Sequence, residues 1–200
     1  MPADPQGTLF APPPQAPPAE DLVGFRYCSY DVPFWVRPNT RGQRWNLPLE
    51  GPTQYWSLTP DGAWAEHIRF NDIVTEAELD EVRMPVWVCR LPSTGLLDLR
   101  DAGVRDRYHL TLADLTANDW SACQRAATTM RAAGARGVLS PSAALGEATN
   151  VALFGPRRAI ALDRRPALAS AVPAAVVAIG RPPRDLLDRV IRASGAVTLF

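Results

Sequence analysis

The arrangement of strand-like and helix-like segments along the chain limits the folds that it can adopt. Short runs rich in Val, Ile and aromatic residues fit β-strands, the clearest at 22–27, 53–58, 84–91, 136–142 and 174–180. Amphipathic helical patterns lie between some of these runs but do not follow every strand. A doubly wound parallel sheet needs regular strand–helix alternation, so this sequence favours an α+β fold.

Local signals mark the ends of two of the helices. Thr59 followed by Pro60 places a hydroxyl at the N-cap and a proline at the first helical position, which predicts a helix over 60–70. A second helix is expected to run from an Asn118 cap to Ala133, where Gly134 ends it. Its predicted buried stripe, at helical spacing, consists of Trp120, Cys123, Ala127 and Met130.

One folded domain is expected after an N-terminal arm. Residues 1–20 are proline-rich and lack periodicity, which is typical of a disordered or polyproline-II-like segment. Residues 21–200 are long enough for one domain with its own hydrophobic core. Towards the end of this domain, 174–180 is expected to be a buried strand and 184–193 an amphipathic helix.

The charge composition argues against several partners and chemistries. The 200 residues contain 21 basic and 21 acidic side chains, so the net charge is zero and no direct binding of nucleic acid or anionic membrane is expected. All the basic residues are arginine, and the absence of lysine excludes Schiff-base catalysis and a P-loop lysine. Neither GxGxxG nor GxxxxGK[ST] occurs, so a Rossmann or P-loop nucleotide site is not predicted.

Cysteine and histidine usage gives no indication of a metal site. The three cysteines form no CxxC pair, and the two histidines are His67 and His109, so a zinc site is not expected. Unpaired cysteines fit a reducing cytoplasm. No basic segment followed by an apolar run marks a signal peptide, and no stretch of about 18 apolar residues predicts a membrane span.

Arg26 and Arg44 are candidates for binding an anion. Arg26 ends a predicted strand beside Tyr27, and Arg44 lies next to Trp45 and Asn46 in a turn-rich segment. A guanidinium group can hold a phosphate through two hydrogen bonds while a neighbouring aromatic ring stacks on a base. Taken singly, each arginine is also compatible with a surface residue or a loop salt bridge.

Glu66 is the candidate catalytic carboxylate. It lies on the helix predicted over 60–70. If Glu66 faces a pocket, its charge can stabilise a ribosyl oxocarbenium ion or accept a hydrogen bond from a ribose hydroxyl. If it faces solvent, it is an ordinary surface carboxylate. His67 points about 100° away on the same helix and is therefore a weak candidate for a general base.

Ser142 and Asn150 are candidates for binding substrate. Ser142 lies in VLSPSA, with no GxSxG sequence and no convincing histidine base, which argues against a serine hydrolase. A hydroxyl at a strand-to-loop turn can instead contact a ligand, and Asn150 can offer an amide to a ribose or a carboxamide. Ser-Pro-Ser is also a favourable turn in its own right.

Together, these segments resemble the RES domain, a family named for its arginine, glutamate and serine. The segments that match, in order, are GFRY at 24–27, GQRWN at 42–46, QYWSLTPDGAWAE at 54–66, SACQRA at 121–126, VLSPSA at 138–143 and NVALF at 150–154. The resemblance covers about 22–165 and leaves 166–200 as a C-terminal extension. It implies a single α+β domain similar to the ADP-ribosyltransferase toxins, with mixed β-sheets flanked by helices.

The resemblance also implies a function, since RES-domain toxins of bacterial toxin–antitoxin pairs degrade or use NAD⁺. It implies cleavage of the nicotinamide–ribose bond, with phosphate or water as acceptor, NAD⁺ as substrate and no separate cofactor. Glu66 and Arg26 match the family's glutamate and arginine and are expected to be catalytic. The implied substrate-binding residues are Tyr27, Arg44, Tyr55, Ser142 and Asn150. A cognate antitoxin is the implied partner.

Two other functions remain open at this point. A mono-ADP-ribosyltransferase that modifies a protein target would use the same pocket. An inactive RES-like binding module is suggested by Trp56 and Trp64, which stand where smaller residues are expected and would reshape the pocket. LSPSA also offers Ser140 as an alternative to Ser142, and the sequence leaves the oligomeric state open.

Overall fold

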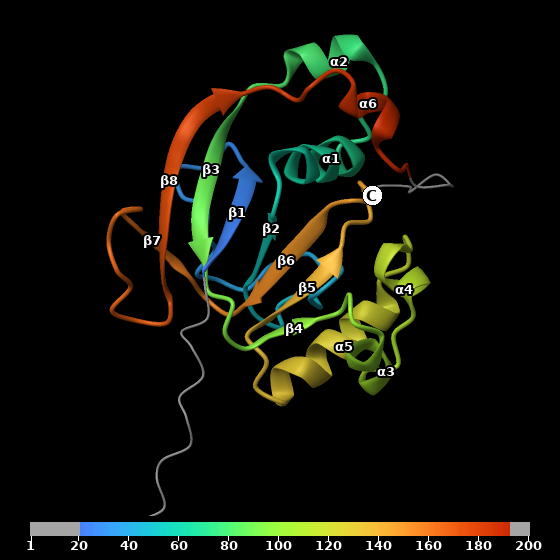
Figure 1. Ribbon diagram of the computed structural model, residues 1–200, viewed down its shortest axis with the longest axis vertical. Helices are drawn as coiled ribbons and strands as arrows, with labels where there is room; N and C mark the ends of the chain where they lie inside the picture. Colours follow the sequence, from blue (N-terminus) through green and yellow to red (C-terminus); the bar gives the residue numbers. More distant parts are fainter. Residues whose placement is uncertain (1–20, 193–200) are drawn as a thin grey trace, which may run out of the picture.

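An eight-stranded mixed sheet runs through the molecule (Figure 1). The computed structural model describes residues 21–192. The strand order is β4-β5-β6-β2-β1-β3-β8-β7, and neighbours are antiparallel except for the outermost pairs β4–β5 and β7–β8. The α+β prediction is therefore confirmed. The strands are β1 (Leu22–Tyr27), β2 (Thr53–Ser57), β3 (Met84–Leu91), β4 (Leu96–Asp98), β5 (Gly137–Pro141), β6 (Thr149–Phe154), β7 (Arg158–Ile160) and β8 (Ala171–Gly180).

The sheet divides between β1 and β2. These two strands pair at one position, Phe25 with Ser57. On the other side, each strand is paired along its whole length: β1 with β3, and β2 with β6. Figure 1 shows β1, β3 and β8 on one side of this division and β2, β6, β5 and β4 on the other. Strands that separate in this way leave side chains and backbone groups open between them.

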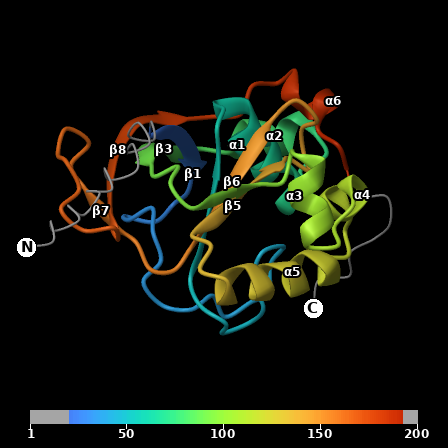
Figure 2. The same cartoon turned by 60° about the horizontal axis from the view of Figure 1, so that its bottom comes forward.

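Within residues 21–192, six helices cover the ends of the sheet. Three lie at one end, and α3, α4 and α5 lie together at the other, as both views show (Figures 1 and 2). The bounds are α1 (Pro60–Phe70), α2 (Glu76–Glu81), α3 (Ala102–Arg107), α4 (Leu112–Thr116), α5 (Ser121–Ala132) and α6 (Leu186–Arg189). Each end has its own buried cluster: Trp64, Ile68 and Leu145 belong to the first, and Leu115 and Met130 to the second.

Helix α1 begins and ends as the sequence predicts. Thr59 is the N-cap, and its hydroxyl accepts a hydrogen bond of 3.1 Å from the Gly62 N–H. Pro60 takes the first helical position, where its missing N–H costs nothing. The strands predicted at 22–27, 53–58 and 84–91 are also confirmed within one residue.

Three local predictions are wrong. Asn118 does not cap α5, which begins at Ser121; Asp119 accepts from the Ser121 N–H, while Asn118 accepts from Arg69. Strand β8 is not buried throughout, because 176–179 are exposed near the edge of the sheet, beyond the part that β7 covers. The helix predicted over 184–193 is only α6, since Val190 has an extended backbone.

The expected proline-rich arm at 1–20 lies outside the described residues, as do 193–200. In the part of the chain that the structure describes, no helix has both the length and the apolar character needed to cross a membrane. Residues 166–192 of the predicted extension contribute β8, which pairs with β3, and α6, which contacts α1.

Candidate active site

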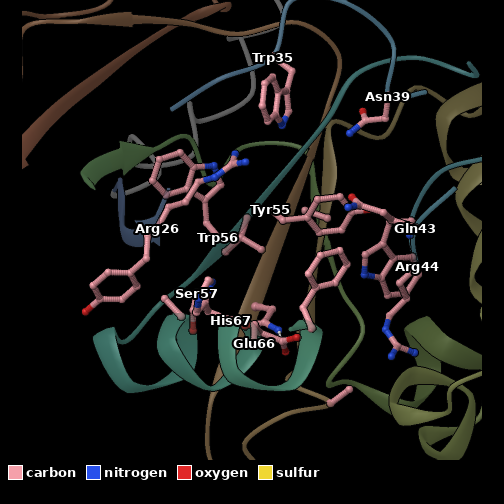
Figure 3. Close-up of a pocket in the computed structure, with 18 of the residues that line it drawn as sticks. Arg26, Trp35, Asn39, Gln43, Arg44, Tyr55, Trp56, Ser57, Glu66 and His67 are labelled. Carbon is pink, nitrogen blue, oxygen red and sulfur yellow. Dashed lines mark hydrogen bonds between the residues drawn. The ribbon is translucent and has the colours of Figure 1, made fainter. Parts of the chain in front are cut away.

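A cavity of about 1220 Å³ opens where β1 and β2 separate. Its walls come from β1, β2, α1, β5, β6 and the long segment between β1 and β2. Figure 3 shows Glu66 on α1 at one side, Arg26 and Trp56 towards β1, and Arg44 beyond the ring of Tyr55. Six of the seven predicted site residues line this cavity: Arg26, Tyr27, Arg44, Tyr55, Glu66 and Asn150.

Two side chains hold the Glu66 carboxylate from behind. Ser142 donates its hydroxyl to Glu66 Oε1 at 2.7 Å, and the Asn150 amide donates to the same oxygen at 2.6 Å. Among the described residues, Oε2 has no hydrogen-bond partner and is therefore available to a ligand in the cavity. Two donors on one oxygen fix the carboxylate in one orientation.

Ser142 does not line the cavity. It is 1% exposed, and its Oγ also accepts from the backbone N–H groups of Ala144 at 3.0 Å and Leu145 at 3.1 Å. The hydroxyl is thus enclosed by the turn after β5 and by Glu66. Ser140 lines the cavity instead, but makes no hydrogen bond to Glu66. Ser142 therefore contacts Glu66 and not the cavity surface, where a substrate-binding residue is expected.

Arg26 lies in an aromatic enclosure with few polar partners. Its Nη1 donates to the Pro33 carbonyl at 2.9 Å, and its Cζ lies 5.4 Å from the ring centroid of Trp35 and 5.8 Å from that of Trp56. No carboxylate among residues 21–192 forms an ion pair with it. Burial lowers the pKa of Arg26, since the charged form loses solvation. An anion that enters the cavity would supply the missing partner.

The cavity wall carries far more positive than negative charge. Six arginines line it, against the carboxylates of Glu66 and Asp72. Arg44, for example, donates a long hydrogen bond of 3.4 Å to the Asp114 carbonyl. A wall of this kind suits a ligand with at least two negative charges, such as a diphosphate. The six arginines are Arg26, Arg37, Arg41, Arg44, Arg69 and Arg192.

Tyr55 organises the loop that carries Arg44. Its hydroxyl accepts from the Trp45 N–H at 3.0 Å and donates to Asn46 Oδ1 at 2.8 Å, so the hydroxyl is used within the protein. Burial raises the pKa of Tyr55, which keeps the phenol neutral. The ring of Tyr55 remains free to form part of the cavity wall.

The ring of Tyr27 lines the cavity and stacks on the ring of Trp64. The two rings stack with centroids 3.4 Å apart and planes 18° from parallel. Trp64 is 2% exposed and does not line the cavity, so it supports Tyr27 from below and leaves the pocket's width unchanged. Trp56 does line the cavity. Burial, and secondarily the charge of Asp61, raise the pKa of Tyr27 to about 12.

The match to a known family covers most of the chain. The sequence model of the RES domain family matches residues 21–175 of this chain. The chain belongs to the RES domain family. A chain in the crystal structure of the M. tuberculosis MbcT-MbcA toxin–antitoxin complex has a similar fold, with a TM-score of 0.62 and 20% identity over 84% of this chain and 87% of that one. No curated protein sequence matches significantly.

Several residues of the RES cavity are not predicted from the sequence. Arg69 follows Glu66 by three positions on α1, a spacing that puts both on one face and is a usable signal. It donates to Asn118 Oδ1 at 2.8 Å, to the Ile191 carbonyl at 3.0 Å and to the Ala143 carbonyl. Trp35 lies in a turn-rich segment without periodicity and gives no such signal.

The RES cavity brings together no recognisable metal ligands. Within residues 21–192, no group of three or more His, Cys, Asp or Glu side chains is placed to hold a metal ion. Cys28, Cys89 and Cys123 are buried and unpaired. His67 lines the cavity, and burial lowers its pKa. Its ring lies against Trp64 and Asn71.

Proposed function

We propose that this RES domain chain is the toxin of a toxin–antitoxin pair and consumes NAD⁺. It would cleave the nicotinamide–ribose bond and transfer the ADP-ribosyl group to phosphate or water. NAD⁺ is the substrate, and we propose no further cofactor. The observation that carries this proposal is the fixed Glu66 carboxylate, with one oxygen unoccupied, in a cavity whose other charged groups are mostly arginines.

The chemistry needs little more than such a site offers. The nicotinamide of NAD⁺ is a cationic leaving group, so no strong acid has to protonate it. As the C–N bond breaks, its electron pair goes to nicotinamide and positive charge develops on the ribose. A carboxylate held beside that ribose stabilises the charge more in the transition state than in the ground state. Glu66 Oε2 is the atom proposed for this role.

The other cavity residues are proposed to bind and orient NAD⁺. Arg26 and Arg44 would hold the pyrophosphate, since a guanidinium matches phosphate oxygens with two hydrogen bonds. Tyr27 and Tyr55 offer ring faces to the flat bases. Asn150 and Ser142 would keep Glu66 in place. Phosphate attack on the ribose carbon then gives ADP-ribose 1″-phosphate and nicotinamide, and water attack gives ADP-ribose, nicotinamide and a proton.

Incubation of the purified protein with NAD⁺, with and without phosphate, tests the proposal. Mass spectrometry is expected to show nicotinamide with ADP-ribose 1″-phosphate or ADP-ribose. Glu66→Gln removes the charge at nearly constant shape and is expected to abolish turnover, whereas Glu81→Gln, at an exposed position on α2, serves as the matched control. Intact NAD⁺ after incubation with folded wild-type protein would refute the proposal.

Labelled NAD⁺ and calorimetry separate two alternatives from this proposal. A mono-ADP-ribosyltransferase that modifies a protein target would place label from radioactive NAD⁺ on a macromolecule in a lysate, not on phosphate or water. An inactive RES-like binding module would leave NAD⁺ intact, and calorimetry at millimolar NAD⁺ would show no binding. Trp64 gives this last alternative little support, because it packs under Tyr27 outside the cavity.

A cognate antitoxin in the cytoplasm is the proposed partner. The solved structure with the similar fold is itself described as a toxin–antitoxin complex. Co-expression with the product of the neighbouring gene, followed by affinity purification of this chain, tests the pairing. A stable complex that restores growth to cells expressing this chain is the expected result. Neither binding nor growth rescue would argue against this partner.

A further inference from the structure

Two residues of the segment between β1 and β2 contact the Arg26 guanidinium, and the residue between them packs beside it. Pro33 accepts its hydrogen bond through the backbone carbonyl, and the Trp35 ring lies over it. Phe34, between them, is 4% exposed and packs on Trp56 with ring centroids 5.2 Å apart. Trp56 is the second ring beside Arg26. The conformation of 33–35 therefore decides where Arg26 points.

The buried side chain of Gln54 fastens Trp35 to the sheet. Gln54 on β2 is 0% exposed, and its side-chain amide binds both the N–H and the carbonyl of Trp35. The Trp35 N–H donates to Gln54 Oε1 at 2.8 Å, and Gln54 Nε2 donates to the Trp35 carbonyl at 2.7 Å. The same Nε2 lies 3.4 Å from the Gly155 carbonyl. This pair of bonds reproduces the pattern between neighbouring strands, but through a side chain.

A second attachment lies four residues further on. The Asn39 amide binds the backbone of Thr53, accepting from its N–H at 2.6 Å and lying 3.4 Å from its carbonyl. Residues 35–39 are thus joined to β2 at adjacent positions, next to the region where β1 and β2 do not pair. Asn39 and Trp35 both line the cavity.

We propose that Gln54 is a positioning residue that locks Trp35 over Arg26, so that the guanidinium is held between Trp35 and Trp56 before substrate arrives. A guanidinium between two rings loses water and rotamer freedom in the free protein, and binding a pyrophosphate then costs less ordering. The effect on NAD⁺ rests on the proposed function. The lock itself depends only on the contacts of Gln54 and Trp35.

Hydrogen exchange tests the lock without reference to activity. Gln54→Leu nearly keeps the volume but removes both bonds to Trp35, so amide exchange at 34–37 is expected to rise at least tenfold above wild type. Gln124→Leu is the matched control. Gln124 donates to the Gln43 carbonyl at 3.0 Å, so its loss should affect the amides near 43–46 and leave those at 34–37 unchanged. Unchanged exchange at 34–37 in folded Gln54→Leu would overturn the lock.

Kinetics tests the consequence for substrate binding. Trp35→Leu removes the indole without touching the buried Gln54, so it remains informative if Gln54→Leu does not fold. Both variants are expected to raise the KM for NAD⁺ about tenfold with kcat changed less than threefold. Trp35→Phe, which keeps a ring, should recover most of the loss. An unchanged KM in Trp35→Leu would overturn the role at Arg26. If wild-type protein neither binds nor consumes NAD⁺, the proposed function fails, while exchange still decides the lock.

Discussion

Replacing Ser142 with alanine tests whether the family serine acts through Glu66. The hydroxyl donates to Glu66 Oε1 at 2.7 Å and is itself held by two backbone N–H groups. Since Ser142 does not reach the cavity, the substitution leaves the ligand's own contacts in place. Its effect on turnover must then come through the orientation of the carboxylate. Among residues 21–192, Asn150 remains as its one side-chain donor.

The expected loss follows from the kind of bond removed. A hydrogen bond to a charged group contributes about 1.5–3 kcal/mol, and a cost of that size in the transition state lowers kcat about 10- to 150-fold. The KM should change less than threefold, because the arginines and tyrosines proposed to bind NAD⁺ are untouched. Two buried N–H groups also lose their acceptor, so the free energy of unfolding should fall by about 1–3 kcal/mol.

Steady-state kinetics and urea denaturation separate these two effects. Ser140→Ala is the matched control: it changes a neighbouring serine that makes no bond to Glu66 and is expected to cost kcat less than threefold. Measurements at a temperature where both variants are fully folded remove stability from the comparison. Wild-type kcat in Ser142→Ala, or a larger loss in Ser140→Ala, would refute a positioning role for Ser142.

Three further predictions concern the cavity wall and the Trp64 ring that packs beneath it. Arg26→Lys, which replaces a fork of donors with a point charge, should raise the KM for NAD⁺ about tenfold or more in steady-state assays. Trp64→Ala should lower the free energy of unfolding by about 3–5 kcal/mol in urea titrations, because it empties a buried site under Tyr27. The raised pKa of Tyr27 means that its unfolded form ionises first. Stability should therefore fall as the pH rises from the unfolded value of 10.0 to about 12, and less steeply in Tyr27→Phe.

Much of the fold can be predicted because local rules and tertiary structure agree. Strands β1, β2 and β3 combine branched and aromatic residues and lie inside the sheet, so composition and position give the same answer. Strand β8 is equally apolar, yet 176–179 are exposed, since composition does not show how far the neighbouring strand extends. Asn118 looks like a cap, but its oxygen binds Arg69, a partner 49 positions away in sequence.

The residues of the candidate site likewise fall into those that local sequence patterns predict and those that they do not. Glu66 and Arg26 lie on regular elements, where the periodicity indicates a face, and both line the cavity. The side-chain amide of Gln54 binds the backbone of Trp35 across 19 positions, and nothing in the turn-rich segment signals that contact. Ser142 shows a third case. Its place in VLSPSA is evident from the sequence, but whether it faces a ligand or another side chain depends on the turn that encloses it.

The segment DGAWAE links the position of α1 to that of its carboxylate. At Gly62 a Cβ would overlap with Ser57 Oγ and Ala148 Cβ, so the absence of a side chain lets α1 lie directly against β2 and the end of β5–β6. Glu66 follows Gly62 by four positions, which places it one turn further along the same face. That face meets Asn150, which pairs with Ser57 in the sheet. Gly62 allows close packing of α1 and therefore fixes where along the sheet Glu66 enters the cavity. Asn150, on β6 of the sheet, then donates the hydrogen bond that holds the carboxylate there.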